Sequence, residues 1–229
     1  MSALIQADGV SAGYGAIPAI HDVNLHVDPG EIVALLGANG AGKTTTLLAL
    51  SGVLSPSAGK VTFLGRATRA PLHRRARQGL GFVPGGRTVF NGLTTEENLR
   101  VSPGGVTNSL RLFPELRPLL KRRAGLLSGG EQQMVSLART LGRMPKLVVV
   151  DELSLGLAPM IVSRLYDALR EAAQQNIAVL LVEQQLHQVL KLADRAYVMR
   201  RGRIELEGST TTLRQRIEDI EKLYLPAGN

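Results

Sequence analysis

The sequence predicts an α/β fold built around a mainly parallel sheet. Two apolar runs, Leu147–Val150 and Ile177–Val182, do not alternate with polar residues, which is typical of central strands buried on both faces. Between them, the stretch from Ile161 to Ala172 carries its apolar residues at helical spacing. A strand, a helix and a second strand in this order indicate an α/β sheet.

Further strands are expected on the N-terminal side of these two. Glu31–Leu36, Val61–Leu64 and Leu80–Val83 are short apolar runs bounded by Gly or Pro. The residues from Val23 to Val27 alternate between apolar and polar, as in a half-buried antiparallel strand. We therefore expect an antiparallel β-subdomain at the N-terminus, beside the mainly parallel sheet.

Residues 85–127 differ in pattern from the rest of the chain. Their periodicity is weak, and they contain Pro103, Gly104, Gly105, Pro114 and Pro118. We expect a small, mostly helical lobe here, inserted between two parts of one core that cover residues 1–84 and 128–208. The tail, residues 209–229, is expected to hold one short polar helix around Leu213–Leu223.

The composition excludes several classes of protein. A chain of 229 residues suggests one domain with a small appended lobe. No apolar run approaches the ~20 residues of a membrane-spanning helix, the N-terminus does not resemble a secretory signal, and the chain has no cysteine for disulfides. The net charge of +8 favours polyanionic partners, but aromatic residues are only 3% with no Trp, which argues against base-stacking platforms.

A glycine-rich loop follows the strand that ends at Leu36. Residues 37–44 read Gly-Ala-Asn-Gly-Ala-Gly-Lys-Thr, the pattern of a phosphate-binding P-loop that opens a helix. Glycines there let backbone N–H groups point at phosphate oxygens, while Lys43 reaches the β- and γ-phosphates and the Thr44 hydroxyl binds Mg²⁺. The residues expected to bind nucleotide are Gly37, Ala38, Asn39, Gly40, Ala41, Gly42, Lys43, Thr44 and Thr45.

Two acids end the strand Leu147–Val150. Asp151 is expected to hold Mg²⁺, and Glu152 to polarise the attacking water, because hydrolysis at a P-loop needs both functions. The alternative is that these acids cap the next helix, which is the minor interpretation beside a phosphate loop.

A third motif, Leu127-Ser128-Gly129-Gly130-Glu131, lies between the other two. A hydroxyl and two glycines at a helix start present bare N–H groups to a phosphate, although the same residues also make an ordinary helix cap. With the three motifs in this order, the chain resembles the ABC-type ATPases over nearly its whole length. Their signature is Leu-Ser-Gly-Gly-Gln, with variation allowed at the last position.

The resemblance implies further roles. Tyr14 occupies the position of an aromatic residue under the adenine ring; the alternative is a tyrosine packed in a turn. Residues 154–158 correspond to a loop that contacts a second cassette. Two cassettes of this family close head to tail, so each MgATP is expected between the Lys43 loop of one chain and Ser128, Gly129 and Gly130 of the other.

Several local strings resemble the smaller ATP-binding subunit of branched-chain amino-acid importers. They include Val83-Pro84-x-Gly86-Arg87 and Val182-Glu183-Gln184. The resemblance implies an ATPase that uses ATP and Mg²⁺, pairs with a second ABC subunit, identical or different, and powers transmembrane permease subunits supplied by a solute-binding protein. It also implies a cytoplasmic chain, peripheral on the inner face of the cell membrane.

Three positions depart from the family pattern. The residue after Val83-Pro84 is usually Gln or Glu, and here it is Gly85; Leu153 replaces the usual proline. The switch histidine is replaced by Gln184, to which we still assign a catalytic role, with His187 as a surface residue. Gly85 and Gln184, beside a short helical lobe, predict intact ATP binding and dimer closure but slow hydrolysis or coupling.

Basic residues form three clusters outside the nucleotide motifs. They are expected either to face anionic lipid head groups, worth about 1 kcal/mol per cation, or to be a solvated arginine-rich surface. The clusters are Arg66, Arg69, Arg74, Arg75 and Arg77; Lys121, Arg122 and Arg123; and Arg195, Arg200, Arg201 and Arg203.

Two alternative functions stay open from the sequence. One is a weakly hydrolysing regulatory cassette paired with a more active one. The other is a soluble ABC ATPase that acts on nucleic acid. The second is disfavoured because the interval between Lys43 and Ser128 has no long coiled-coil insert and the chain holds a single cassette, so no nucleic-acid partner is expected.

Overall fold

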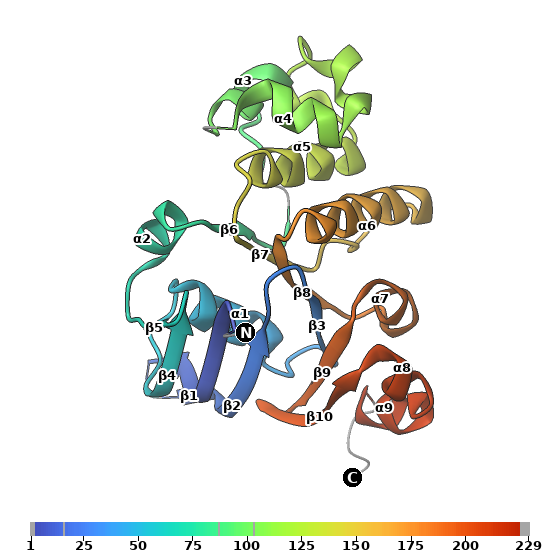
Figure 1. Ribbon diagram of the computed structural model, residues 1–229. Coiled ribbons are helices and arrows are strands. Elements are labelled where there is room, and N and C mark those ends of the chain that lie inside the picture. Colours follow the sequence, from blue (N-terminus) through green and yellow to red (C-terminus); the bar gives the residue numbers. More distant parts are fainter. Residues whose placement is uncertain (1–2, 16, 87, 103, 225–229) are drawn as a thin grey trace.

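Two sheets form the body of the molecule (Figure 1). The computed structural model describes residues 3–15, 17–86, 88–102 and 104–224. A four-stranded sheet has the order β2-β1-β4-β5 and a six-stranded sheet the order β10-β9-β3-β8-β7-β6. The strands are β1 Ile5–Tyr14, β2 Ile17–Val27, β3 Ile32–Leu36, β4 Ala58–Phe63, β5 Arg66–Ala67, β6 Leu80–Val83, β7 Leu147–Asp151, β8 Ala178–Glu183, β9 Arg195–Arg200 and β10 Arg203–Ser209.

The six-stranded sheet is mainly parallel, as predicted. β6, β7, β8, β3 and β9 pair in parallel, and only β10 pairs antiparallel, with β9. Every residue of β7 and β8 is buried. Along β8, Val179 and Leu181 belong to one hydrophobic core, whereas Leu180 and Val182 belong to a second core on the other face. The absence of polar alternation in these strands therefore follows from burial on both faces.

The four-stranded sheet is antiparallel and confirms the expected N-terminal β-subdomain. β1 pairs antiparallel with both β2 and β4. Its buried residues share a core with the face of the six-stranded sheet that carries α1 (Lys43–Ser51). Because β3 leads from this core directly into α1, the connecting loop lies at the carboxyl end of a rigid strand, where ligands of α/β sheets bind.

The helices cover the other face and form the lobe (Figure 1). α3, α4 and α5 lie together at the top of the molecule, and α5 contacts both of the others as well as α6 and β6. The Thr94 hydroxyl caps α3 and Glu97 completes a capping box, which fixes where the lobe begins. The remaining helices are α2 Leu72–Arg77, α3 Thr95–Arg100, α4 Gly105–Leu112, α5 Gly129–Leu141, α6 Pro159–Gln174 and α7 Leu186–Leu192, with short 3-10 helices at Pro114–Leu119 and Ala124–Leu126.

The tail contains two short helices, α8 (Thr210–Arg214) and α9 (Ile217–Tyr224), rather than the single helix expected around Leu213–Leu223. Ser209 caps α8 by accepting a hydrogen bond from Thr212 N, so the helix begins earlier than the apolar pattern indicates. The two helices have different anchors: Arg214 donates to Leu190 O of α7, and α9 packs on β9. The last residues of the expected segment, 225–229, lie outside the described residues, as do Arg87 and Pro103.

Two of the clustered arginines are structural rather than surface residues. Arg75 is 1% exposed and donates to the backbone oxygens of Ala70, Leu50 and Thr68. Arg195 pairs with Glu31 across β9 and the start of β3, with 3.1 Å between Nη1 and Oε1. The interpretation as part of a lipid-facing or solvated surface is therefore wrong for Arg75, whereas Arg195 keeps 25% of its side chain exposed beside the ion pair. Within the described ranges, no helix combines the length and apolar character needed to cross a bilayer.

Candidate active site

The phosphate loop connects β3 to α1 with a backbone that requires glycine. Gly42, immediately before α1, has φ +104°. A Cβ atom at Gly42 would lie 2.7 Å from Ile20 Cγ2, so a side chain is excluded by space as well as by conformation. The loop can therefore bring backbone N–H groups close to a bound phosphate, at the positive end of the α1 dipole.

Lys43 is held inside this loop. Its ammonium donates to Gly37 O at 2.9 Å and Ala38 O at 3.0 Å, and the side chain is 4% exposed. Burial lowers the pKa of Lys43, while the nearby carboxylates of Glu152, Asp151 and Glu183 act in the opposite direction. The ammonium is thus positioned over the loop before any phosphate arrives, which suits binding of a polyphosphate anion.

A pocket of about 340 Å³ opens over the loop and unites most of the predicted nucleotide site. Its walls come from β2, the loop, the first turn of α1 and the end of β7. The lining residues are Ala19, Asn39, Gly40, Ala41, Gly42, Lys43, Thr44, Thr45 and Glu152. Gly37 and Ala38 contribute through the carbonyl oxygens that hold Lys43.

Thr44 and Asp151 meet across the loop and the end of β7. Thr44 Oγ1 donates to Asp151 Oδ1 at 3.4 Å, and Asp151 is 6% exposed. Burial raises the pKa of Asp151, against the effect of the Thr44 hydrogen bond and of Lys43. A hydroxyl and a desolvated carboxylate are oxygen ligands of the kind that Mg²⁺ prefers, so these residues fit the ion expected with ATP.

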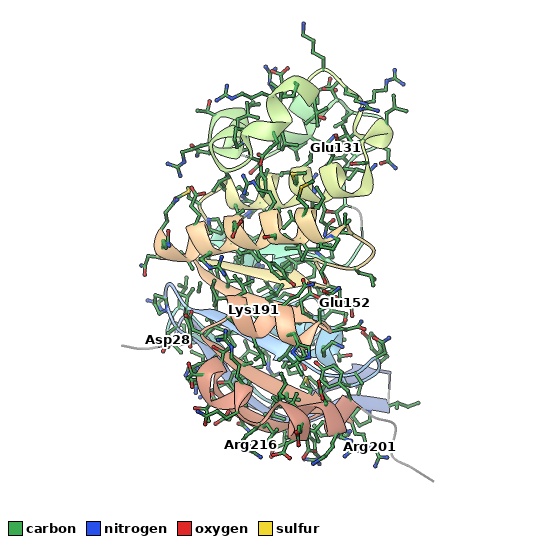
Figure 2. The ribbon with its side chains drawn as sticks, turned by 90° about the vertical axis from the view of Figure 1, so that its right-hand side faces the viewer. Asp28, Glu131, Glu152, Lys191, Arg201 and Arg216 are labelled. Atoms are coloured by element: carbon green, nitrogen blue, oxygen red, sulfur yellow. The ribbon has the colours of Figure 1, made fainter. Side chains whose placement is uncertain are left out.

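Glu152 and Gln184 form a pair at the ends of neighbouring strands. Gln184 Nε2 donates to Glu152 Oε1 at 2.6 Å, and Glu152 N donates to Val182 O at 2.9 Å. Glu152 has φ +44°, a left-handed conformation that is uncommon for a residue with a side chain and that concentrates at functional sites. The labelled Glu152 lies at the edge of the sheet region, below α6 in Figure 2.

Gly85 follows β6 and lies beside Asp151. A Cβ atom at this position would be 3.6 Å from Asp151 Oδ2 and 3.7 Å from Asp151 Cγ, an ordinary contact distance. The position is therefore close to Asp151, the residue expected to hold Mg²⁺, but it carries no side chain. The space around Gly85 accommodates the first atoms of a larger residue.

The structure does not bring Ser128, Gly129 and Gly130 to the phosphate loop. Ser128 caps α5: its hydroxyl accepts from Glu131 N at 3.3 Å, and Glu131 Oε2 accepts from Ser128 N at 2.6 Å. Figure 2 places Glu131 in the helical lobe, well separated from Glu152. Within one chain, this motif and the phosphate loop therefore belong to two different sites.

Tyr14 also lies outside the residues that line the pocket. It ends β1 opposite Ile17 of β2, and its side chain is 58% exposed. Two residues beyond Ile17 along β2, Ala19 does line the pocket. His187 is a surface residue, as predicted, with Nε2 3.4 Å from Glu221 Oε1.

Two residues near the site have no role in the sequence-based assignment. Tyr224 of α9 accepts a hydrogen bond from Gly37 N at 3.0 Å, and burial raises the pKa of Tyr224 to about 12. Glu183 at the end of β8 is 2% exposed and accepts two hydrogen bonds from Ser154. An acid that ends an apolar strand is a readable signal for Glu183, whereas the Tyr224 contact joins distant parts of the chain and has no local signal.

The known proteins that this chain resembles include ATP-binding proteins of transport systems. Residues 20–154 match the family model described as ABC transporter. The high-affinity branched-chain amino acid transport ATP-binding protein BraG of Pseudomonas aeruginosa is 42% identical over 221 residues, which cover 92% of this chain and 94% of BraG. The lipopolysaccharide export system ATP-binding protein LptB of Acidithiobacillus ferridurans is 32% identical over 242 residues, 98% of each chain. A solved ATP-binding cassette of an ABC transporter superposes with a TM-score of 0.88 at 25% identity, covering 99% of this chain and 100% of the other.

Proposed function

The chain belongs to the ABC transporter family as an ATP-binding subunit, and from that premise we propose that it hydrolyses MgATP to power an importer of branched-chain or related amino acids. The observation that carries the proposal is one pocket that combines Lys43, Thr44 and Glu152, with Asp151 hydrogen-bonded to Thr44. The resemblance to BraG supports the class of solute. The relatives reported above are transport proteins, which favours this proposal over action on nucleic acid.

Each residue of the pocket has a role in the proposed reaction. The loop 37–42 and Lys43 bind the β- and γ-phosphates of ATP through N–H groups and the ammonium. Thr44 and Asp151 would hold Mg²⁺, which supplies positive charge to the phosphate oxygens when bound. Glu152 orients the attacking water and accepts its proton, and Gln184 holds the Glu152 carboxylate in place through the 2.6 Å hydrogen bond. Tyr14 is proposed to stack on the adenine ring.

A second cassette completes the site in this proposal. Ser128 is exposed and its backbone N–H is already satisfied within its own chain by Glu131. We propose that Ser128, Gly129 and Gly130 contact the ATP held by the partner, and that residues 154–158 line the same junction. Leu155 is 70% exposed, which supports its burial by a second subunit, whether a copy of this chain or a related one.

A groove beside the lobe is the proposed docking site for a permease segment. It has a volume of about 250 Å³ and lies between α2, β6, α3 and α5. Val101 is 56% exposed at its rim. The groove is lined by Leu72, Ala76, Leu80, Gly81, Phe82, Val101, Ser102, Arg139, Thr140 and Arg143. Docking there would place the chain on the inner face of the membrane.

The proposed hydrolysis is slow, because Gly85 supplies no side chain beside Asp151 and Gln184 has no titratable group to exchange a proton near neutrality. A regulatory cassette paired with a faster one is the alternative within the same family. Introducing Gly85→Gln tests this point: we expect faster ATP hydrolysis by the complex. Normal hydrolysis by the wild-type complex, with transport unchanged by Gly85→Gln, would contradict the slow-turnover proposal.

Reconstitution tests the transporter proposal directly. The full chain would be purified with permease subunits, a second cassette and a solute-binding protein chosen from genes found beside its own, and placed in lipid vesicles. We expect uptake of leucine, isoleucine or valine that requires ATP and is lost with Glu152→Gln. ATP hydrolysis stimulated by lipopolysaccharide in place of these amino acids would support an export function and contradict the import proposal.

A further inference from the structure

Glu183 is a buried acid that the proposed mechanism does not use. It ends β8, is 2% exposed, and accepts hydrogen bonds from Ser154 N at 2.9 Å and from Ser154 Oγ at 2.8 Å. Ser154 is itself 2% exposed, so both hydrogen bonds lie away from solvent. A pair of buried bonds to one carboxylate fixes the position of Ser154 more tightly than a single neutral hydrogen bond does.

The surroundings of Glu183 contain several polar groups from other elements. Burial and the adjacent Glu183 carboxylate raise the pKa of the Tyr166 hydroxyl on α6. The charge of Glu183 also acts on Lys43 and on Tyr224. Burial raises the pKa of Glu183, and the two Ser154 hydrogen bonds oppose that shift. Keeping an acid in such a place costs folding free energy, which calls for a role that an apolar residue would not fill.

Three consecutive residues, 182–184, make hydrogen bonds to Glu152 and Ser154, which lie two positions apart in the chain. Val182 O accepts from Glu152 N, and Gln184 Nε2 donates to the Glu152 carboxylate. Between them, Glu183 holds Ser154, the buried first residue of the segment 154–158, in which Leu155, Gly156 and Ala158 are exposed. A displacement of that segment would therefore be transmitted through Ser154 and Glu183 to the end of β8, which also positions Glu152.

We propose that Glu183 is a positioning residue that links the loop 154–158, exposed at Leu155, to the Glu152–Gln184 pair, so that contact of this loop with a second cassette sets the orientation of Glu152. The inference rests on the proposed function, since it needs a second cassette at the loop. It adds to that function a route by which closure of the dimer controls hydrolysis. The covalent chemistry of the reaction is unchanged in this proposal, because Glu183 is not among the residues that line the pocket.

Two substitutions at Glu183 distinguish the positioning role from an effect on folding stability alone. Glu183→Gln keeps the length of the side chain, an acceptor for Ser154 N and a donor that faces Ser154 Oγ, so we expect near-normal turnover. Glu183→Leu replaces the carboxylate with an apolar group of similar size and so removes both contacts. We expect kcat for ATP to fall roughly tenfold to a hundredfold, as when a reacting group is misplaced by about 1 Å, with little change in KM.

Ser154→Ala tests the same contact from the other side and does not disturb β8. Ser154→Ala alone is expected to lower kcat. The Ser154→Ala/Glu183→Leu double variant is expected to be no slower than Glu183→Leu, because the hydroxyl contact that Ser154→Ala removes is already lost in Glu183→Leu. Ser109→Ala is the matched control. The Ser109 hydroxyl is equally buried and bonds to Ala138 O in the lobe, so its loss should lower thermal stability and leave kcat unchanged.

The measurement is steady-state ATP hydrolysis by the purified full chain, with ATP-dependent dimerisation followed by light scattering. Unchanged kcat in Ser154→Ala, or multiplicative losses in the double variant, would overturn the inference. A wild-type chain that binds no ATP and never hydrolyses it would instead overturn the proposed function. The two failures are therefore distinguishable in one set of proteins.

Discussion

The phosphate loop and the Ser128 motif, which the family places on the two sides of one nucleotide, are built in opposite ways. Lys43 and Asp151 are 4% and 6% exposed; Lys43 is held by the carbonyl oxygens of the loop that follows β3, and Asp151 ends β7, in which every residue is buried. Ser128 is exposed, caps the start of α5, and makes its hydrogen bonds within the first turn of that helix, to Glu131 and Gln132. The first region gathers its residues within one chain, whereas the second is a capped helix start at the surface. This difference indicates a site shared between two chains.

Removing the positive charge of Lys43 from the buried region should have the largest effect on ATP binding and hydrolysis. Lys43→Ala leaves the loop without the cation that faces the β- and γ-phosphates, so we expect ATP binding and hydrolysis to fall by about 10²-fold or more. Equilibrium binding of a fluorescent ATP analogue and phosphate release measure both. Lys60→Ala, an exposed lysine paired with Asp8, is the control and should behave as wild type. Tight ATP binding by Lys43→Ala would show that the loop is not the phosphate site.

Glu152→Gln should separate binding from chemistry within the same region. The amide keeps the size of the side chain but accepts no proton, so kcat should drop by about 10²-fold to 10⁴-fold while ATP affinity stays close to that of wild type. The trapped complex should appear as an ATP-dependent dimer in light scattering. Equal losses of affinity and turnover would mean that Glu152 binds nucleotide rather than orienting water.

Ser128→Ala probes the exposed region. It removes a helix cap, which costs about 1 kcal/mol of folding free energy, and it removes the hydroxyl proposed to meet the partner's ATP. We expect ATP binding to the single chain to be unchanged, with dimerisation and hydrolysis reduced. Ser209→Ala removes the cap of α8 and matches the structural loss. If both variants lose the same small amount of stability and neither loses activity, Ser128 is a cap and nothing more.

Tyr224→Phe should have the smallest effect on ATP binding, and it tests whether the C-terminal tail belongs to the nucleotide site. Its hydroxyl accepts from Gly37 N, so its loss removes one hydrogen bond, worth about 0.5–1.5 kcal/mol, at the start of the phosphate loop. We expect a modest loss of ATP affinity with kcat maintained. Tyr197→Phe removes a hydroxyl that accepts from His26 N away from the pocket, and should change stability only. Identical ATP affinity in Tyr224→Phe and wild type would exclude the tail from the nucleotide site.

The same contrast explains what the sequence could predict. The parallel strands β3, β6, β7 and β8, the phosphate loop and the acids at the end of β7 were predictable because each depends on a local pattern: an apolar run, glycines at fixed spacing, or acids at a strand end. β1 and β9 were not predicted, and neither was β10, where Arg203–Ser209 alternates in burial but charged residues mask the pattern. The burial of Arg75 depends on three carbonyl groups from α1 and the segment before α2, and the Tyr224 contact joins the tail to Gly37. Such contacts form only after the chain has folded, so no local spacing announces them.

A cross-link between the two regions tests the central claim of a shared site most directly. The chain has no cysteine, so Asn39→Cys and Ser128→Cys can be introduced together in the Glu152→Gln protein without background. The account predicts a disulfide-linked dimer that forms with ATP and is absent when either cysteine is introduced alone. A protein that binds ATP yet never cross-links, alone or with the second cassette that copurifies with it, would contradict the shared site.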